Sequence, residues 1–223
     1  MTDDKFDFMN EVVERGTIVA KKENPNYTLV TIASDLSPVF LDGERVYKRN
    51  FPHIFFTGEA KEKCKNFKVK NVVTIKGFAQ TRKGKIGDKE AYLLGVTATD
   101  IEEAPKVFID GNVSANGKVY EPELNEVRLA GRVSECRILN ENLISVRVIC
   151  KYDNNRQRSI EVLYRTKVSE FTSQILPNDY VYVIGFIQTR EPDPKRTRRT
   201  EWLSAREIIK ANERSGSNNV EEN

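Results

Sequence analysis

The chain has 223 residues, of which 39% are hydrophobic and 31% charged, and its formal net charge is +3, which suits one or two domains with a buried core. No run approaches the roughly 20 apolar residues of a membrane span. The acidic start, Met1 to Phe8, lacks the basic-then-apolar order of a signal peptide, so we expect a cytoplasmic protein without a membrane partner. Cys64, Cys136 and Cys150 form no Cys-x-x-Cys pair, so neither a disulfide framework nor a metal site is expected.

The first half of the chain is predicted to be mostly strand, because apolar and polar residues alternate in it. A helix is expected over Glu59 to Phe67, where the apolar spacing changes. Strands are expected at Gly16 to Ala20, Tyr27 to Ser34, Phe51 to Thr57, Val72 to Gln80 and Ala91 to Asp100.

The middle of the chain, Ile101 to Leu124, contains the turn signals Asp110-Gly111 and Asn116-Gly117. It leaves two alternatives open, a short hairpin or an irregular connection. After it the strand pattern returns, with a helix expected over Lys167 to Leu176 and ended by Pro177. Strands are expected at Val127 to Leu139, Ile144 to Cys150, Ser159 to Arg165, Tyr180 to Arg190 and Glu201 to Ile209.

The two halves are copies of one unit. Gly77-Phe-Ala-Gln-Thr-Arg82 returns 108 residues later as Gly185-Phe-Ile-Gln-Thr-Arg190. The first copy is longer, and its extra residues are expected in Leu36 to Tyr47, which contains an Asp42-Gly43 turn signal. Three strands, a helix and two strands predict a five-stranded Greek-key barrel, the OB-fold. The predicted class is all-β with one short helix per domain, as two tandem OB-folds at 10–104 and 125–210, a linker at 105–124 and a disordered tail at 211–223.

Basic side chains recur at equivalent places, which favours an anionic partner over ordinary solvated charges. OB-folds use the loop between their last two strands on oligonucleotides, and this loop is basic in both copies. The candidate nucleic-acid contacts are Lys76, Arg82, Lys83 and Lys85 in the first copy and Arg128, Arg132, Arg147, Lys151, Arg190, Lys195, Arg196, Arg198 and Arg199 in the second.

Aromatic rings on the same elements could act as platforms for unstacked bases. Alternation places Phe55 and Phe56 on opposite faces of their strand, so one of them belongs to the core. For any one ring, core packing is the alternative to stacking, but some stacking is expected from the set. The candidates are Phe51, Phe56, Tyr92, Tyr164 and Trp202, with Tyr92 near the place in the first copy that Trp202 has in the second.

At these residues the chain resembles the bacterial single-stranded DNA-binding proteins. The resembling stretches are Phe56 to Lys65, Lys70 to Arg82 and Val96 to Ala98, and in the second copy Asn125 to Val133 and Asp179 to Arg190. The resemblance implies sequence-independent binding and protection of single-stranded DNA in replication, recombination or repair. It also implies stacking on Phe56, Tyr164 and Phe51, and a homodimer that presents four OB-folds.

The chain departs from this family in two places. The family has a tryptophan after the Thr-Arg motif, and this chain has Gly84 and Pro192 near that place instead. The sequence closes on Glu221-Glu222-Asn223, where the family has an acidic tip closed by phenylalanine. Replication or recombination proteins stay candidate partners, although the sequence lacks the tip through which the family recruits them. The compact form suits a phage or mobile element.

No enzymatic activity and no cofactor are expected, because the only histidine is His53 and no phosphate-binding loop motif occurs. Two other functions stay open. One is an RNA-binding OB protein, and the other is a protein-binding OB adaptor in a replication or mobilisation complex. For assembly, the strand Val127 to Leu139 is a candidate edge for a dimer, unless an interdomain hairpin covers that edge and keeps the chain monomeric.

Overall fold

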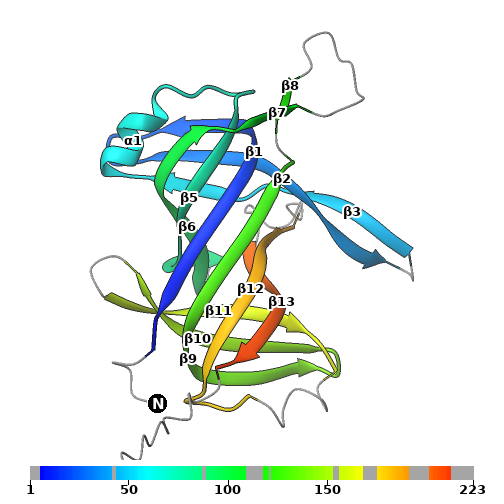
Figure 1. The fold of residues 1–223 in the computed structure, drawn as a ribbon. Coiled ribbons are helices and arrows are strands. Elements are labelled where there is room, and N and C mark those ends of the chain that lie inside the picture. Colours follow the sequence, from blue (N-terminus) through cyan, green and yellow to red (C-terminus); the bar gives the residue numbers. More distant parts are fainter. Residues whose placement is uncertain are drawn as a thin grey trace, which may run out of the picture.

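The computed structural model describes residues 6–41, 44–86, 89–108, 118–120, 122–152, 156–167, 175–190 and 201–211 (Figure 1). Within these ranges only the backbone is described at 35–41, 44–48, 83–86, 89–92, 107–108, 118–120 and 152. None of the helices in the described part of the chain is long and apolar enough to cross a membrane.

The N-terminal strands close into a barrel. Its strands are β1 (Met9–Glu23), β2 (Thr28–Leu41), β4 (His53–Phe56), β5 (Val72–Ile86) and β6 (Lys89–Glu103). The ring closes because β1 pairs with both β2 and β5, while β4 joins β2 to β6, the latter in parallel. Helix α1 (Gly58–Cys64) covers one end of the ring and buries Ala60 and Cys64 (Figure 1). This closed five-stranded barrel with its short helix is consistent with the OB-fold.

The C-terminal strands pair in the same order. They are β9 (Leu124–Asn140), β10 (Leu143–Tyr152), β11 (Arg156–Arg165), β12 (Tyr180–Thr189) and β13 (Glu201–Lys210). β9 pairs with both β10 and β12, and the parallel pairing of β11 with β13 completes the ring. The helix expected at Lys167 to Leu176 falls largely on 168–174, outside the described residues. We call the two rings the first barrel and the second barrel.

Two segments extend the first barrel. The extra residues of the first copy form an arm in which β3 (Glu44–Asn50) pairs with the end of β2 and projects from the barrel (Figure 1). The middle segment contains β7 (Lys106–Phe108) and β8 (Lys118–Tyr120), which pair antiparallel as a separate sheet. Two alternatives were open for this segment, a hairpin or an irregular connection, and the pairing of β7 with β8 corresponds to the hairpin.

The repeated glycines lie where strands of one barrel approach each other most closely. A Cβ added at Gly77 would collide with the carbonyl oxygen of Thr97, and one at Gly185 with that of Ser204. Gly16 and Gly131 meet the backbone of the second strand in the same way. Both strands that carry Gly77 and Gly185 also shift register at that glycine, as a β-bulge does. The repeat motif is therefore explained first by barrel closure.

The two barrels are joined by a strand pairing within the chain. β1 runs antiparallel to β9 from Met9 opposite Ala130 to Arg15 opposite Leu124 (Figure 1). β1 thus covers the candidate edge, Val127 to Leu139, only as far as Ala130, and for the rest of the strand an edge open to a second chain stays a prediction. The covered part is paired with β1 and not with the hairpin, because β1 is long enough to serve its own barrel and this junction.

The junction has nearly twofold symmetry. Its centre is Val12 opposite Val127, and these residues occupy equivalent places, since they face Gly77 and Gly185 respectively. Asn10 exchanges hydrogen bonds of 2.8 and 2.9 Å with the backbone of Ala79, and Asn125 exchanges bonds of 2.7 and 2.8 Å with that of Ile187. Each asparagine thus joins the first strand of its barrel to the fourth.

Candidate nucleic-acid interface

An aromatic and cationic cluster lies on the outer face of the first barrel, where β2, β4 and β5 meet. The Phe55 ring is half-buried and lies 5.6 Å from the Tyr27 ring, measured between centroids. The Arg82 guanidinium lies 3.8 Å from the centroid of Phe55. Phe55 takes this position because β4 alternates, so Ile54 and Phe56 point into the barrel and His53 and Phe55 point outward.

Arg82 is held against the ring by further contacts. Its Nη2 donates a 3.0 Å hydrogen bond to the Thr97 hydroxyl, and the Gln80 amide lies against both groups. Burial lowers the pKa of Arg82, yet a guanidinium stays charged in proteins. The result is a cation with part of its hydration removed, next to a ring that can stack, which is an arrangement suited to a base and its phosphate.

The second barrel carries different side chains at the equivalent positions. The registers of β10, β11 and β13 place Leu143 where the first barrel has Tyr27, and Leu163 where it has Phe55. Glu161 stands in the place of His53 and accepts a 2.6 Å hydrogen bond from the Ser145 hydroxyl. The β10 and β11 positions of this face are therefore aliphatic and acidic, while Phe186, with the Arg206 guanidinium 5.1 Å from its ring centroid, lies beside them on β12.

Trp202 of the second barrel has no aromatic equivalent in the first barrel. Trp202 is half-buried and pairs with Gln188, as Gly95 pairs with Gln80 in the first barrel. Trp202 is therefore equivalent to Gly95 and not to a position near Tyr92, three residues earlier. At Gly95 the side chain of Arg82 occupies the space that an added Cβ would approach.

The predicted stacking residues need one clear correction. The side chain of Phe56 is 0% exposed and belongs to the hydrophobic core, so it offers no face to a base. Tyr164, at the equivalent place, is half-buried and packs against the core. Phe51 is half-buried and its backbone N–H donates a 2.9 Å bond to the Thr189 hydroxyl of the second barrel. Strand period separates Phe55 from Phe56, and the closure of the barrel decides that Phe55 is the one outside.

Most of the described basic candidates have acidic or polar neighbours. Lys76 lies 3.7 Å from Glu102, Arg128 lies 2.6 Å from Glu126, and Arg147 lies 3.0 Å from Glu135. These three cations are partly neutralised and do not gather at the aromatic cluster. Other positions are as follows: Arg132 bonds Asn178 at 2.9 Å, Lys151 lies 4.6 Å from the Phe8 ring, and Arg190 is exposed at the end of β12.

The remaining candidates cannot be placed as side chains. Those of Lys83, Lys85 and Tyr92 lie outside the described part of the structure. So do residues 191–200, which contain Lys195, Arg196, Arg198 and Arg199.

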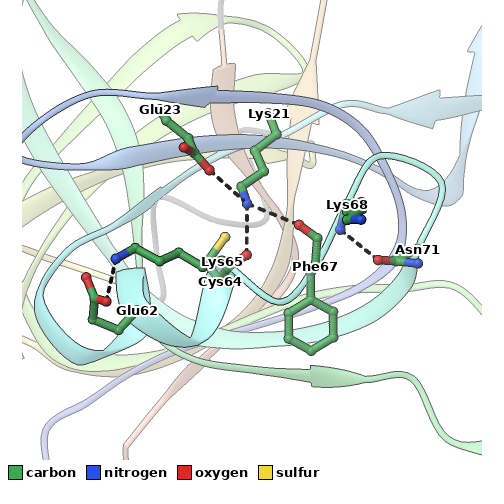
Figure 2. Close-up of polar contacts among 8 residues, drawn as sticks. All are labelled: Lys21, Glu23, Glu62, Cys64, Lys65, Phe67, Lys68 and Asn71. Carbon is green, nitrogen blue, oxygen red and sulfur yellow. Dashed lines mark hydrogen bonds and ion pairs between the residues drawn. The ribbon is translucent and has the colours of Figure 1, made fainter.

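The end of helix α1 is fixed by a half-buried lysine. Lys21 Nζ donates hydrogen bonds of 3.0 and 3.1 Å to the carbonyl oxygens of Cys64 and Phe67, and lies 3.1 Å from Glu23 (Figure 2). The turn that follows is closed where Lys68 N–H donates 2.7 Å to the Asn71 side chain. A cation at the end of the helix satisfies carbonyl groups that have no helical partner. This holds the connection between β4 and β5, which carry Phe55 and Arg82.

The described residues offer no cluster of side chains that could hold a metal ion. Cys64 and Cys150 are buried and Cys136 is half-buried, all as free thiols. Burial raises the pKa of Cys150 to about 12, so this thiol is a residue of the hydrophobic core and not a nucleophile.

Sequence reasoning missed Phe55 and Tyr27 as site residues. The alternation around Phe55 and Phe56 identified two faces but did not say which face is inside. Only the folded structure shows which face of β4 points inward, because α1 closes the barrel next to β4 and buries Ala60 and Cys64 there.

Comparison with known proteins gives a fold likeness alone. No protein-family model matches the chain, and no curated sequence matches it. The crystal structure of wild-type single-stranded DNA binding protein from Thermus aquaticus is similar, with a TM-score of 0.63 and 17% identity over 92% of this chain and 94% of that chain. A deletion mutant of the same protein has a TM-score of 0.63 and 16% identity, over 92% and 96% of the chains.

Proposed function

We propose that this protein binds single-stranded DNA without sequence preference, with bases stacking on the outer face of the first barrel. The observation that carries the proposal is the half-buried Phe55 ring, held between the Tyr27 ring and the Arg82 guanidinium on the outer face of the first barrel. Every base has a π-face, so a ring of this kind accepts any base. The guanidinium can at the same time contact a phosphate.

The fold supports this proposal. The similar structures are of a protein described as single-stranded DNA binding, and they cover nearly the whole chain. We propose that the two barrels are tandem OB-fold domains at about 10–104 and 125–210, joined by a linker at 105–124. DNA replication, recombination or repair is the setting in which such a protein would protect single strands.

We also propose a homodimer, because two barrels per chain are half of the four that the resembling family presents. Its interface cannot use the β9 edge from Leu124 to Ala130, which β1 covers. Light scattering should give twice the chain mass of 25.6 kDa. A mass of one chain across the micromolar range, with tight DNA binding retained, would contradict the dimer.

The central test is fluorescence anisotropy with labelled oligo-dT, in competition with duplex DNA and poly-U. We expect tight binding to oligo-dT, weaker binding to duplex, and a slope of log affinity against log salt of roughly −0.7 per phosphate contacted. Equal affinity for duplex, or a slope near zero, would sink the proposal. Stronger competition by poly-U would instead assign the site to RNA, where the 2′-hydroxyl decides.

A further inference from the structure

Besides the β1–β9 pairing, the barrels are joined at a second place, next to the aromatic cluster. The backbone N–H of Thr189 donates 3.1 Å to the Asn50 side chain, while the Thr189 hydroxyl accepts from Phe51. The backbone N–H and the Nδ1 of His53 lie 2.8 and 2.5 Å from one carboxylate oxygen of Glu201. The start of β4 is thus bound to the end of β12 and the start of β13.

These contacts are shielded from solvent. Asn50 is 2% exposed, and the side chains of His53 and Glu201 are 30% and 10% exposed. Hydrogen bonds to a charged acceptor are stronger than neutral ones, and burial limits competition from water. The two barrels are therefore held in one orientation at this place.

The contact exists on one side of the molecule only. By strand register, Glu161 of the second barrel is equivalent to His53, and Leu94 of the first barrel is equivalent to Glu201. A leucine cannot accept hydrogen bonds, so the symmetry-related place lacks the carboxylate contact. There the Thr81 hydroxyl donates a 2.7 Å bond to the Ser159 carbonyl.

The contact links two surfaces that carry outward-facing aromatic and basic groups. Phe55 follows His53 by two residues, Arg190 follows Thr189, and Trp202 follows Glu201. The backbone of the stacking face in the first barrel thus lies beside the strand ends that carry Arg190 and Trp202. A single strand stacked on Phe55 has the second barrel as its next surface.

We infer that Glu201 is a positioning residue that aligns the two barrels so that one DNA strand passes from Phe55 onto the β12–β13 end of the second barrel. This inference rests on the proposed function. When two surfaces are rigidly linked, a strand bound to one meets the other at high effective concentration, and a loosened link lowers this concentration. The consequence is specific: only strands long enough to reach both barrels feel the loss.

The experiment measures dissociation constants for short and long oligo-dT with wild-type protein, E201A, E201Q and F55A. One OB-fold covers roughly 4–16 nucleotides, so strands of about 6 and about 24 nucleotides sample one barrel and both. E201A should weaken binding of the long strand by about tenfold and change the short strand less than about twofold. E201Q keeps an oxygen that accepts from the His53 N–H, and it should recover most of the long-strand affinity.

The control is E102A, which also removes one carboxylate but lies at the Lys76 ion pair away from this contact. It should leave the ratio of long-strand to short-strand affinity unchanged. If E201A weakens both lengths by the same factor, or neither, with an unchanged melting temperature for the folded protein, the inference is overturned. If instead F55A leaves short-strand binding unchanged, the stacking site of the proposed function fails.

Discussion

The two barrels have the same strand order and bulged glycines, but equivalent outer faces carry different chemistry. In the first barrel Tyr27 and Phe55 lie next to the Arg82 guanidinium. In the second barrel the corresponding residues are leucines, and Glu161 stands where the first has His53. Closure of a barrel constrains the inward residues and the glycines, whereas an outward residue can change without loss of packing. Repeats therefore reveal the fold and do not show that both copies bind equally.

On the opposite side of the barrels the difference is reversed. The outer face of β12 and β13 carries Tyr182 and Ile209, which are 39% and 44% exposed, where the first barrel has Thr74 and Glu102. Phe6 is buried there and lies 5.5 Å from the Tyr182 ring. In the second barrel Tyr180 and Tyr182 thus pack against Phe6, where the first barrel has Val72 and Thr74.

The largest expected effect separates core from surface. Phe56→Ala should lower the free energy of unfolding by about 3–5 kcal/mol, because the ring is fully buried. Tyr164→Ala, at the equivalent place, should cost less since that ring is half-buried. Denaturant unfolding of both variants checks this order. A stable Phe56→Ala protein with impaired DNA binding would restore Phe56 as a stacking residue.

The comparison of the outer faces predicts unequal effects on binding. Phe55→Ala should weaken binding of oligo-dT by about 1–3 kcal/mol, the range for loss of one stacking platform. Its matched partner, Leu163→Ala, should change affinity by less than about twofold, since an aliphatic side chain offers no ring to stack. Anisotropy titrations with thermal melts give both values. Equal losses would mean that the barrels share the strand evenly.

A smaller effect is expected from the two arginines of the repeated motif. Arg82→Gln removes the cation from the Phe55 ring and should cost about 0.5–2 kcal/mol of binding. Arg190→Gln removes an exposed charge and should act mainly through the salt dependence of binding. Titrations at two salt concentrations separate the loss of the cation–ring contact from the loss of an exposed charge. A larger loss of affinity at high salt for Arg190→Gln than for Arg82→Gln would contradict the difference between the two barrels.

The smallest effect concerns the acidic side chain on the second barrel. Glu161→Gln keeps an oxygen that accepts from Ser145 and removes one negative charge from that face. Affinity for single strands should rise by about twofold at low salt and by less at physiological salt, because screening weakens exposed charges. Glu135→Gln, a change of the same charge beside Arg147, serves as a comparison. A loss of affinity in Glu161→Gln would assign this carboxylate a direct binding role.

The sequence by itself determined the repeat, the strand order and the helix of the first copy, because period-two alternation and glycine spacing are local consequences of barrel packing. Through the repeated motif it also predicted Arg82, which lies in the proposed binding face. Strand ends were less well predicted: the strand expected at Gly16 to Ala20 is the 15-residue β1, since pairing partners and not local pattern set its length.

Only the tertiary structure decided which face of each strand is outside and which edges are free. Alternation divides Phe55 from Phe56 but is symmetric between inside and outside, and barrel closure with α1 breaks that symmetry. Part of the β9 edge is covered by β1, which lies more than 100 residues earlier in the chain, so no local pattern could report it. The pairing of Lys76 and Arg147 with carboxylates depends on the same folding, because strand register brings Glu102 and Glu135 to them, whereas the partner of Arg128 is Glu126, two residues earlier on the same strand.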